Sequence, residues 1–278
     1  MSIKKDVIRL LETDLYYEIH GEGIPIIMLH GWGVDLNLMS GCMERFFEQY
    51  RYEFKRIYID LPGMGNSNAS KSIRKSDDIL NVILAFIQEV ISDRQFILVG
   101  ESYGGYLARA LLQRKSKQIL GLLLICPLMY PGYRQGNIPK LKVLEKDNIF
   151  IESLSDKERS YFEYITIIQN RKVWERFKTD IYDALIKNEN SHFLNNVLDG
   201  AFSYDIDKLE KPFDKPGLIM VGKQDTEVGY IDQFKLLEKY PRTSFAVLDK
   251  AGHNLQIEQV ELFNSLVHEW LERLIAEL

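Results

Sequence analysis

Cysteine is scarce in this 278-residue sequence, and it has no excess of basic residues. Two cysteines, Cys42 and Cys126, are too few for a disulfide framework or a cysteine-rich metal site, so we expect two core thiols and no metal ion. The net charge is −5, and the lysines and arginines are scattered among acidic residues. This balance argues against a nucleic-acid-binding surface.

Long apolar runs are missing as well. No run approaches the ~20 residues that a membrane-spanning helix needs. Residues 1–6 carry charges, but no long apolar core follows them as in a secretory signal. We therefore expect a cytoplasmic protein with no membrane span. The rest of the composition, 46% hydrophobic and 27% charged, is typical of an enzyme-sized globular chain.

The sequence does contain an alternation of short apolar runs and amphipathic stretches. The apolar runs lie at residues 26–29, 57–59, 96–99, 122–126, 218–221 and 245–248, after an antiparallel opening at 7–11 and 15–19. One amphipathic stretch begins at Ser76, which we expect to act as the helix cap, and another covers residues 260–278. The alternation predicts an α/β fold with a mostly parallel central sheet and helices on both faces.

The alternation is interrupted between residues 128 and 215. Helical patterns occur there at about 156–169, 172–187 and 191–202, without a strong buried strand. Aromatic residues recur through this interval, which could roof an apolar pocket, although most of them should pack helix on helix. We therefore predict a core formed by residues 1–127 and 216–278, with residues 128–215 as an inserted helical cap.

Ser102 lies in a strand, turn and helix context. Residues 100–104 read Gly-Glu-Ser-Tyr-Gly between the apolar run 96–99 and a helical stretch. Such a turn strains the serine backbone, while Gly100 and Gly104 allow the strand and the helix to approach without Cβ clashes. We therefore predict that Ser102 is an exposed nucleophile. Ser67 follows a similar glycine, but no helix begins there, so we expect a loop residue.

A serine hydroxyl needs a base to take its proton and an acid to orient that base. His253 lies in the loop after the last predicted strand, on the side of the sheet from which it can reach Ser102. Asp225 follows the preceding strand and gives the order serine, aspartate, histidine, with Glu227 as the alternative acid. Three other histidines are expected to be structural or solvated: His20, His192 and His268.

Taken together, these motifs resemble the α/β-hydrolase superfamily, in its single-cap branch of esterase-like and C–C-hydrolase-like members. The resemblance covers nearly the whole chain and depends on residues 30–33, 60–67, 100–104, 222–225 and 252–253, in family order. It implies an oxyanion hole formed by the backbone N–H groups of Trp32 and Tyr103. It also implies that His30, Gly31 and Gly33 shape the loop that carries Trp32.

Tyr103 opens a predicted helix, so its N–H has no partner within that helix and lies at the positive end of the helix dipole. This placement agrees with the implied oxyanion role. The turn at residues 60–67 is expected to be structural, with no chemistry assigned to Asp60. A serine at position 102 also argues against the family members that open epoxides or remove halide, because those use an aspartate there.

The resulting hypothesis is a cofactor-independent serine hydrolase that cleaves small to medium esters through a covalent acyl-enzyme. An alternative is C–C bond hydrolysis or a lyase-like step on a keto acid, for which Arg134 or Arg171 should contact a substrate carboxylate. A second alternative is a binding protein for small molecules that has lost turnover. The physiological substrate, the acyl-chain preference and the oligomeric state stay open.

Overall fold

The central sheet follows the predicted order of strands. The computed structural model describes residues 3–132 and 135–278. Its eight-stranded sheet has the order β1-β2-β4-β3-β5-β6-β9-β10. The strands are β1 (Ile3–Leu10), β2 (Thr13–His20), β3 (Ile24–Leu29), β4 (Phe54–Ile59), β5 (Phe96–Glu101), β6 (Ile119–Ile125), β9 (Gly217–Gly222) and β10 (Thr243–Leu248). The β1–β2 and β2–β4 pairs are antiparallel and the other pairs are parallel, so the predicted α/β fold is confirmed.

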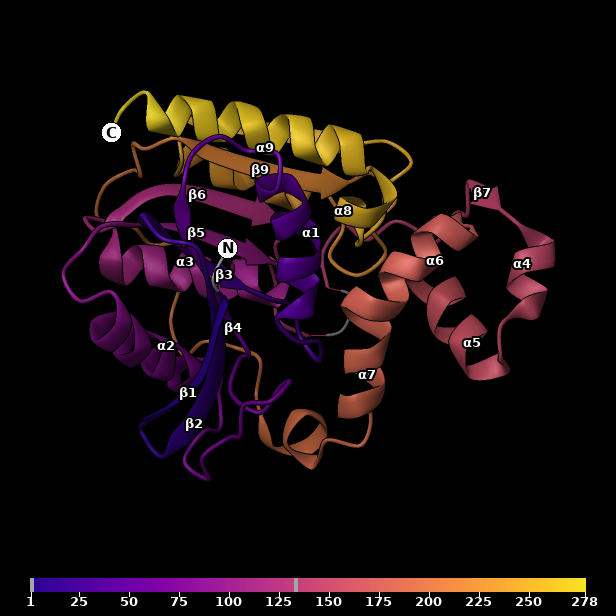
Figure 1. Ribbon diagram of the computed structural model, residues 1–278, viewed down its shortest axis with the longest axis horizontal. Coiled ribbons are helices and arrows are strands. Elements are labelled where there is room, and N and C mark those ends of the chain that lie inside the picture. The colour runs from indigo at the N-terminus through magenta and orange to yellow at the C-terminus, as the bar shows by residue number, and fades with distance from the viewer. Residues whose placement is uncertain (1–2, 133–134) are drawn as a thin grey trace.

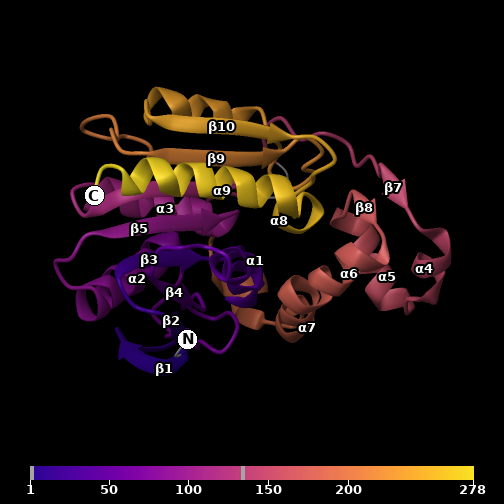
Figure 2. The same ribbon diagram turned by 45° about the horizontal axis from the view of Figure 1, so that its top comes forward.

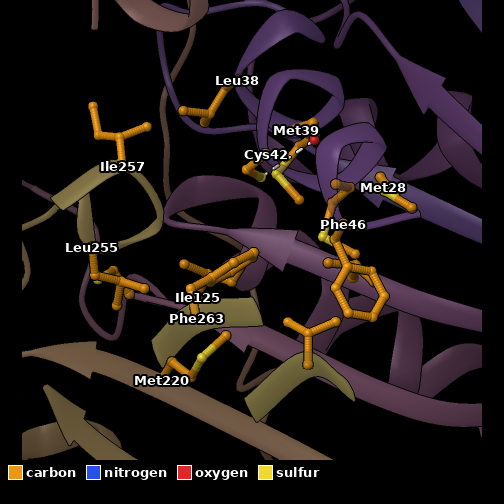
Figure 3. Close-up of a cluster of buried hydrophobic side chains, with 14 of the residues drawn as sticks. Met28, Leu38, Met39, Cys42, Phe46, Ile125, Met220, Leu255, Ile257 and Phe263 are labelled. Carbon is orange, nitrogen blue, oxygen red and sulfur yellow. Dashed lines mark hydrogen bonds between the residues drawn. The ribbon is translucent and has the colours of Figure 1, made fainter. Parts of the chain in front are cut away.

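Helices cover both faces of this sheet (Figures 1 and 2). One face packs against α1 (Asn37–Phe47) and α9 (Val260–Ile275), and the other packs against α2 (Ser76–Val90) and α3 (Tyr103–Lys115). Because both faces are buried, neighbouring strand residues are apolar and point to opposite cores. Figure 3 shows part of the first core, where Met28, Ile125 and Met220 of the strands meet Phe46 and Phe263 of the helices.

Most of the remaining helices gather beyond one end of the sheet (Figure 1). They are α4 (Asn148–Ser153), α5 (Asp156–Ile165), α6 (Arg171–Phe177), α7 (Asp183–Asn188) and the π-helical turns Lys178–Tyr182 and Phe193–Val197. Nearer the C-terminus are a 3₁₀ segment (Asp232–Glu238) and the short helix α8 (Leu255–Glu258). Among the described residues, no helix is both long and apolar enough to cross a membrane.

The helical interval differs from its prediction in two stretches. The stretch at 156–169 ends as a helix at Ile165, because residues 168–169 form β8 (Ile168–Gln169) with β7 (Glu145–Lys146). Two-residue strands are too short to produce a periodic signal, so they escaped the sequence pattern. The stretch at 191–202 is reduced to the π turn Phe193–Val197.

The expected cap of α2 is also wrong. Ser76 is the first helical residue, and Lys75 occupies the cap position. The Ser76 hydroxyl instead donates to the carbonyl of Gly200 at 2.8 Å and lies 2.6 Å from the hydroxyl of Tyr103. It therefore connects α2 to the start of α3 and to the loop at residue 200. Cys42 and Cys126 are both buried free thiols, as predicted.

Candidate active site

Ser102 occupies the sharp turn between β5 and α3. Its backbone has φ 52° and ψ −115°, in the half of conformational space that non-glycine residues rarely adopt. A Cβ atom at Gly100 would lie 2.4 Å from the carbonyl oxygen of Gly104, and one at Gly104 would lie 2.1 Å from that of Leu29. The turn can therefore be this tight only with glycine at both positions.

Loops after β9 and β10 bring Asp225 and His253 together. The Nδ1 atom of His253 lies 2.8 Å from Oδ2 of Asp225, and both side chains are buried. The other oxygen of Asp225 accepts the backbone N–H groups of Glu227 and Val228 at 2.8 and 3.0 Å. Burial lowers the pKa of His253, but the charge and hydrogen bond of Asp225 outweigh it and raise that pKa well above its usual value.

Glu227, the alternative acid, is placed differently. The backbone N–H of Glu227 donates to the Asp225 carboxyl, and Glu227 also lines the cavity described in the next paragraph. Within the described parts of the chain, Asp225 is the carboxylate bonded to Nδ1 of His253. The geometry therefore favours Asp225 over Glu227 as the partner of the histidine.

One cavity of about 570 Å³ opens beside Ser102 and His253. Its walls are mostly apolar, and the segment 128–215 contributes many of them. The sheet side of the cavity wall includes Trp32, Glu101, Ser102, Tyr103, Glu227 and His253. From the segment 128–215 come Tyr161, Tyr164, Ile165, Ile181, Leu185 and Leu198. An apolar cavity with a few convergent polar groups is the usual form of a small-molecule site.

The Nε2 atom of His253 lies 3.4 Å from Oε1 of Glu101. In the described residues, no hydrogen bond joins the hydroxyl of Ser102 to His253. Catalytic hydrogen bonds of this kind are often long before a substrate is bound. Sequence reasoning assigned no role to Glu101. The sequence feature that could have indicated such a role is the position of this carboxyl, which follows the apolar run 96–99 and directly precedes Ser102.

The backbone N–H groups of Trp32 and Tyr103 both belong to residues of the cavity wall. Tyr103 is the first residue of α3, where N–H groups have no partner within the helix. Among the described residues, neither N–H donates a hydrogen bond to a protein acceptor. The Trp32 ring packs edge-on against Tyr103 with 5.0 Å between centroids, which fixes the two loops relative to each other.

His30 holds the loop that carries Trp32. It is fully buried, its Nε2 accepts the N–H of Leu61 at 2.9 Å, and its Nδ1 donates to the carbonyl of Gly31 at 2.7 Å. Burial lowers the pKa of His30 to about 4, so the ring stays neutral. Gly33 follows with φ 76°, a conformation that favours glycine.

Asp60 and Ser67 hold the neighbouring turn. The Asp60 carboxyl accepts the backbone N–H groups of Leu36 and Asn66 at 2.8 and 2.7 Å. The Ser67 hydroxyl donates to the carbonyl of Asp60 at 2.7 Å and accepts the N–H of Tyr16 at 2.8 Å. Ser67 is therefore a loop residue, as predicted, and its hydroxyl is occupied by structural hydrogen bonds.

The structure describes one of the two arginines expected to meet a substrate carboxylate, and it does not line the cavity. The guanidinium of Arg171 lies over the ring of Phe150, 4.9 Å from its centroid, and Arg171 is not one of the lining residues. Arg134 lies outside the described residues.

Potential metal ligands meet at one place in the described chain. Atoms of Cys126, Asp225 and His253 lie within 4.8 Å of one another. Burial raises the pKa of the Cys126 thiol to about 12, whereas metal binding requires a thiolate. Asp225 is already bonded to His253, so the arrangement suits an acid–base pair better than a metal site.

Comparison with known proteins agrees with the fold. A family model described as the alpha/beta hydrolase fold matches residues 24–260. The chain therefore belongs to the α/β-hydrolase fold family.

Related proteins include enzymes of two kinds. A 2-hydroxy-6-oxononadienedioate/2-hydroxy-6-oxononatrienedioate hydrolase of Pseudomonas putida is 22% identical over 94% of this chain and 93% of its own. A pimeloyl-[acyl-carrier protein] methyl ester esterase of Aeromonas salmonicida is 25% identical over 90% and 96%.

A solved α/β superfamily hydrolase of Oenococcus oeni is 32% identical and superimposes with a TM-score of 0.83, covering 94% of this chain and 96% of its own.

Proposed function

We propose that this protein is a serine hydrolase that cleaves carboxylic esters. The observation that carries the proposal is the buried Asp225–His253 pair, which opens onto the same apolar cavity as the strained turn of Ser102. A nucleophile, a base and an acid that orients the base are the groups that acyl transfer by serine requires. The hydrolase and esterase names of the relatives support the same class of reaction.

In this mechanism the Ser102 oxygen attacks the ester carbonyl carbon, and its proton moves to Nε2 of His253. Asp225 holds the opposite ring nitrogen and stabilises the imidazolium that forms. The negative charge on the carbonyl oxygen would be held by the N–H groups of Trp32 and Tyr103. Collapse of this intermediate breaks the bond to the alcohol, which leaves with the proton from His253. Water then attacks the acyl-enzyme by the same route and releases the acid.

Residues 128–215 would act as the cap of this site over a core of residues 1–127 and 216–278. Side chains from both parts line the cavity, and those from 128–215 are mainly aromatic or aliphatic. They would bind an apolar acyl or alcohol group and keep water from the reacting carbonyl.

C–C bond hydrolysis of a keto acid is the alternative that the Pseudomonas putida relative supports. That reaction needs a group that binds the substrate carboxylate. Among the described residues of the cavity wall there are two carboxyls, Glu101 and Glu227, and no lysine or arginine. Arg134, which was expected to bind such a carboxylate, lies outside the described residues, so a comparison of ester and keto-acid substrates decides between the two reactions.

Labelling with a fluorophosphonate, followed by peptide mass spectrometry, tests the proposal. We expect one adduct, on Ser102, which is lost in Ser102→Ala and strongly reduced in His253→Ala. Hydrolysis of 4-nitrophenyl butyrate should fall by a factor on the order of 10³ or more in both variants.

Ser67→Ala is the matched control, because Ser67 follows a similar glycine but has a structural hydroxyl. It should keep both the label and the activity. A folded wild type that is neither labelled nor active would contradict the proposal and favour a binding protein.

A further inference from the structure

Glu101 is a buried carboxyl in the wall of the cavity, next to the proposed nucleophile. Only 2% of the residue is exposed. Most other buried carboxyls of the described chain are held by hydrogen-bond donors: Asp60, for example, accepts the backbone N–H groups of Leu36 and Asn66, and Asp180 accepts from the side chains of Arg176 and Thr179. In the part of the chain that the structure describes, no backbone N–H donates to Glu101. The fold therefore gains little from this carboxyl, which suggests a role in the site.

Two features hold the Glu101 carboxyl toward the reacting groups. On one side, Oε1 lies 3.4 Å from Nε2 of His253. On the other side, a Cβ atom at Gly31 would lie 2.5 Å from Oε2 and 3.3 Å from the Cβ of Ser102. Only a glycine leaves room for the carboxyl there, between the loop of Trp32 and the imidazole.

A negative charge at this position acts on any substrate whose carbonyl reaches Ser102. The surrounding walls are mostly apolar, so the charge is screened less than at the surface. A second negative charge placed a few bonds from the scissile carbonyl would be repelled by it. A neutral group of the same size would not.

We propose that Glu101 makes this site selective for uncharged acyl groups and excludes substrates with a carboxylate close to the scissile carbonyl. This inference rests on the proposed esterase function and narrows its substrate class. It assigns the discrimination between charged and uncharged acyl groups to the side chain of Glu101. The apolar walls would instead determine which chain lengths fit.

The selectivity should depend on pH. Burial raises the pKa of Glu101 to about 7, while the charge on His253 acts to lower it and that on Asp225 to raise it. The thiol of Cys42, on α1, also lies within its field. The carboxyl is therefore mostly neutral at pH 6 and mostly charged at pH 8, and repulsion of an anionic acyl group should increase between these values.

The test compares two esters with the same leaving group and similar acyl size. One is the mono-4-nitrophenyl ester of succinic acid, which is an anion, and the other is its neutral methyl ester. At pH 8 we expect wild type to prefer the neutral ester in kcat/KM by on the order of tenfold or more. Glu101→Gln should reduce that preference about tenfold, and in wild type it should weaken at pH 6. Using the ratio cancels any effect of the substitution on chemistry that the two esters share.

Glu227→Gln, which removes the other carboxyl of the wall, is the comparator. A preference that shifts in Glu227→Gln but not in Glu101→Gln would overturn the inference, as would one that stays constant between pH 6 and 8 in wild type. The wild-type pH series decides the matter even if Glu101→Gln does not fold. Failure of wild type to hydrolyse either ester would contradict the esterase proposal itself, and the inference with it. If both esters are hydrolysed but the ratio of their kcat/KM values is the same in Glu101→Gln as in wild type, only the role assigned to Glu101 is contradicted.

Discussion

Two carboxyls flank the imidazole of His253, and they differ in how firmly they are held. Asp225 is tied to Nδ1 at 2.8 Å and to two backbone N–H groups, so its position is fixed. Glu101 lies 3.4 Å from Nε2, the nitrogen that takes the proton of Ser102 in the proposed mechanism. The charge on Glu101 favours the imidazolium form, so it stabilises that form once the serine has lost its proton. The same charge makes the free base less available beforehand.

At the same scale, Gly104→Ala should damage the turn of Ser102. The added methyl group would lie 2.1 Å from the carbonyl oxygen of Leu29, which is backbone and cannot turn away. We expect a loss of roughly 1 to 3 kcal/mol or more in the free energy of unfolding, measured with urea, together with weaker fluorophosphonate labelling.

Gly200→Ala is the matched control for Gly104→Ala, since its Cβ would meet only Trp32, at 3.6 Å. This change should stay within about 0.5 kcal/mol. Equal losses in the two variants would mean that the close approach at Gly104 is not what the turn depends on.

At the scale of elements, Glu258 connects the loop of His253 to the segment 128–215. Its carboxyl, at the end of α8, accepts the N–H of Gly252 at 2.6 Å and those of Ile167 and Ile168 at 2.6 and 3.3 Å. Gly252 directly precedes His253. The carboxyl thus fixes where the histidine loop lies relative to the strand β8.

Glu258→Gln would turn one acceptor oxygen into an amide group that faces N–H donors. We expect a loss of roughly 1 to 3 kcal/mol in unfolding free energy and a kcat lower by roughly tenfold to a hundredfold, with a smaller change in KM. Glu261→Gln, three residues further on an exposed site, is the control and should change neither. A stability loss with unchanged kcat would show that Glu258 supports the fold without positioning His253.

Elements also explain how much the sequence could predict. Ser102, Asp225 and His253 each follow a strand of a parallel sheet, and the carboxyl ends of such strands meet at one edge, so their convergence follows from the pattern. Glu101 also lies at the carboxyl end of a strand. The direction of its side chain, however, depends on the space left by Gly31, which belongs to a loop far away in the sequence. The short strands β7 and β8 depend on tertiary contacts in the same way. Secondary-structure propensity and hydrophobic periodicity carry no information about the direction of the Glu101 side chain or about these two short strands.

At the scale of the whole molecule, three buried carboxyls should make stability depend on pH. Burial raises the pKa of Asp60, Glu101 and Glu258 to about 7 in each case, from ordinary values of 3.8 to 4.5. Between about pH 4.5 and 7 the folded chain keeps protons that the unfolded chain has released. Stability therefore falls as pH rises through that window. The pKa of Glu44 is lowered to about 2, so its contribution is lost only below that window, as pH falls.

We expect the Tm to be several degrees lower at pH 8 than at pH 6. Each of these carboxyls changes the unfolding free energy by up to about 1.4 kcal/mol per pH unit within the window. For a domain of this size, 1 kcal/mol moves the Tm by roughly 2 to 4 °C. Thermal unfolding followed by circular dichroism measures the change, and Glu101→Gln should make it smaller, because a glutamine does not titrate. A Tm that rises from pH 6 to pH 8 would mean that these carboxyls are already ionised in the folded protein at pH 6.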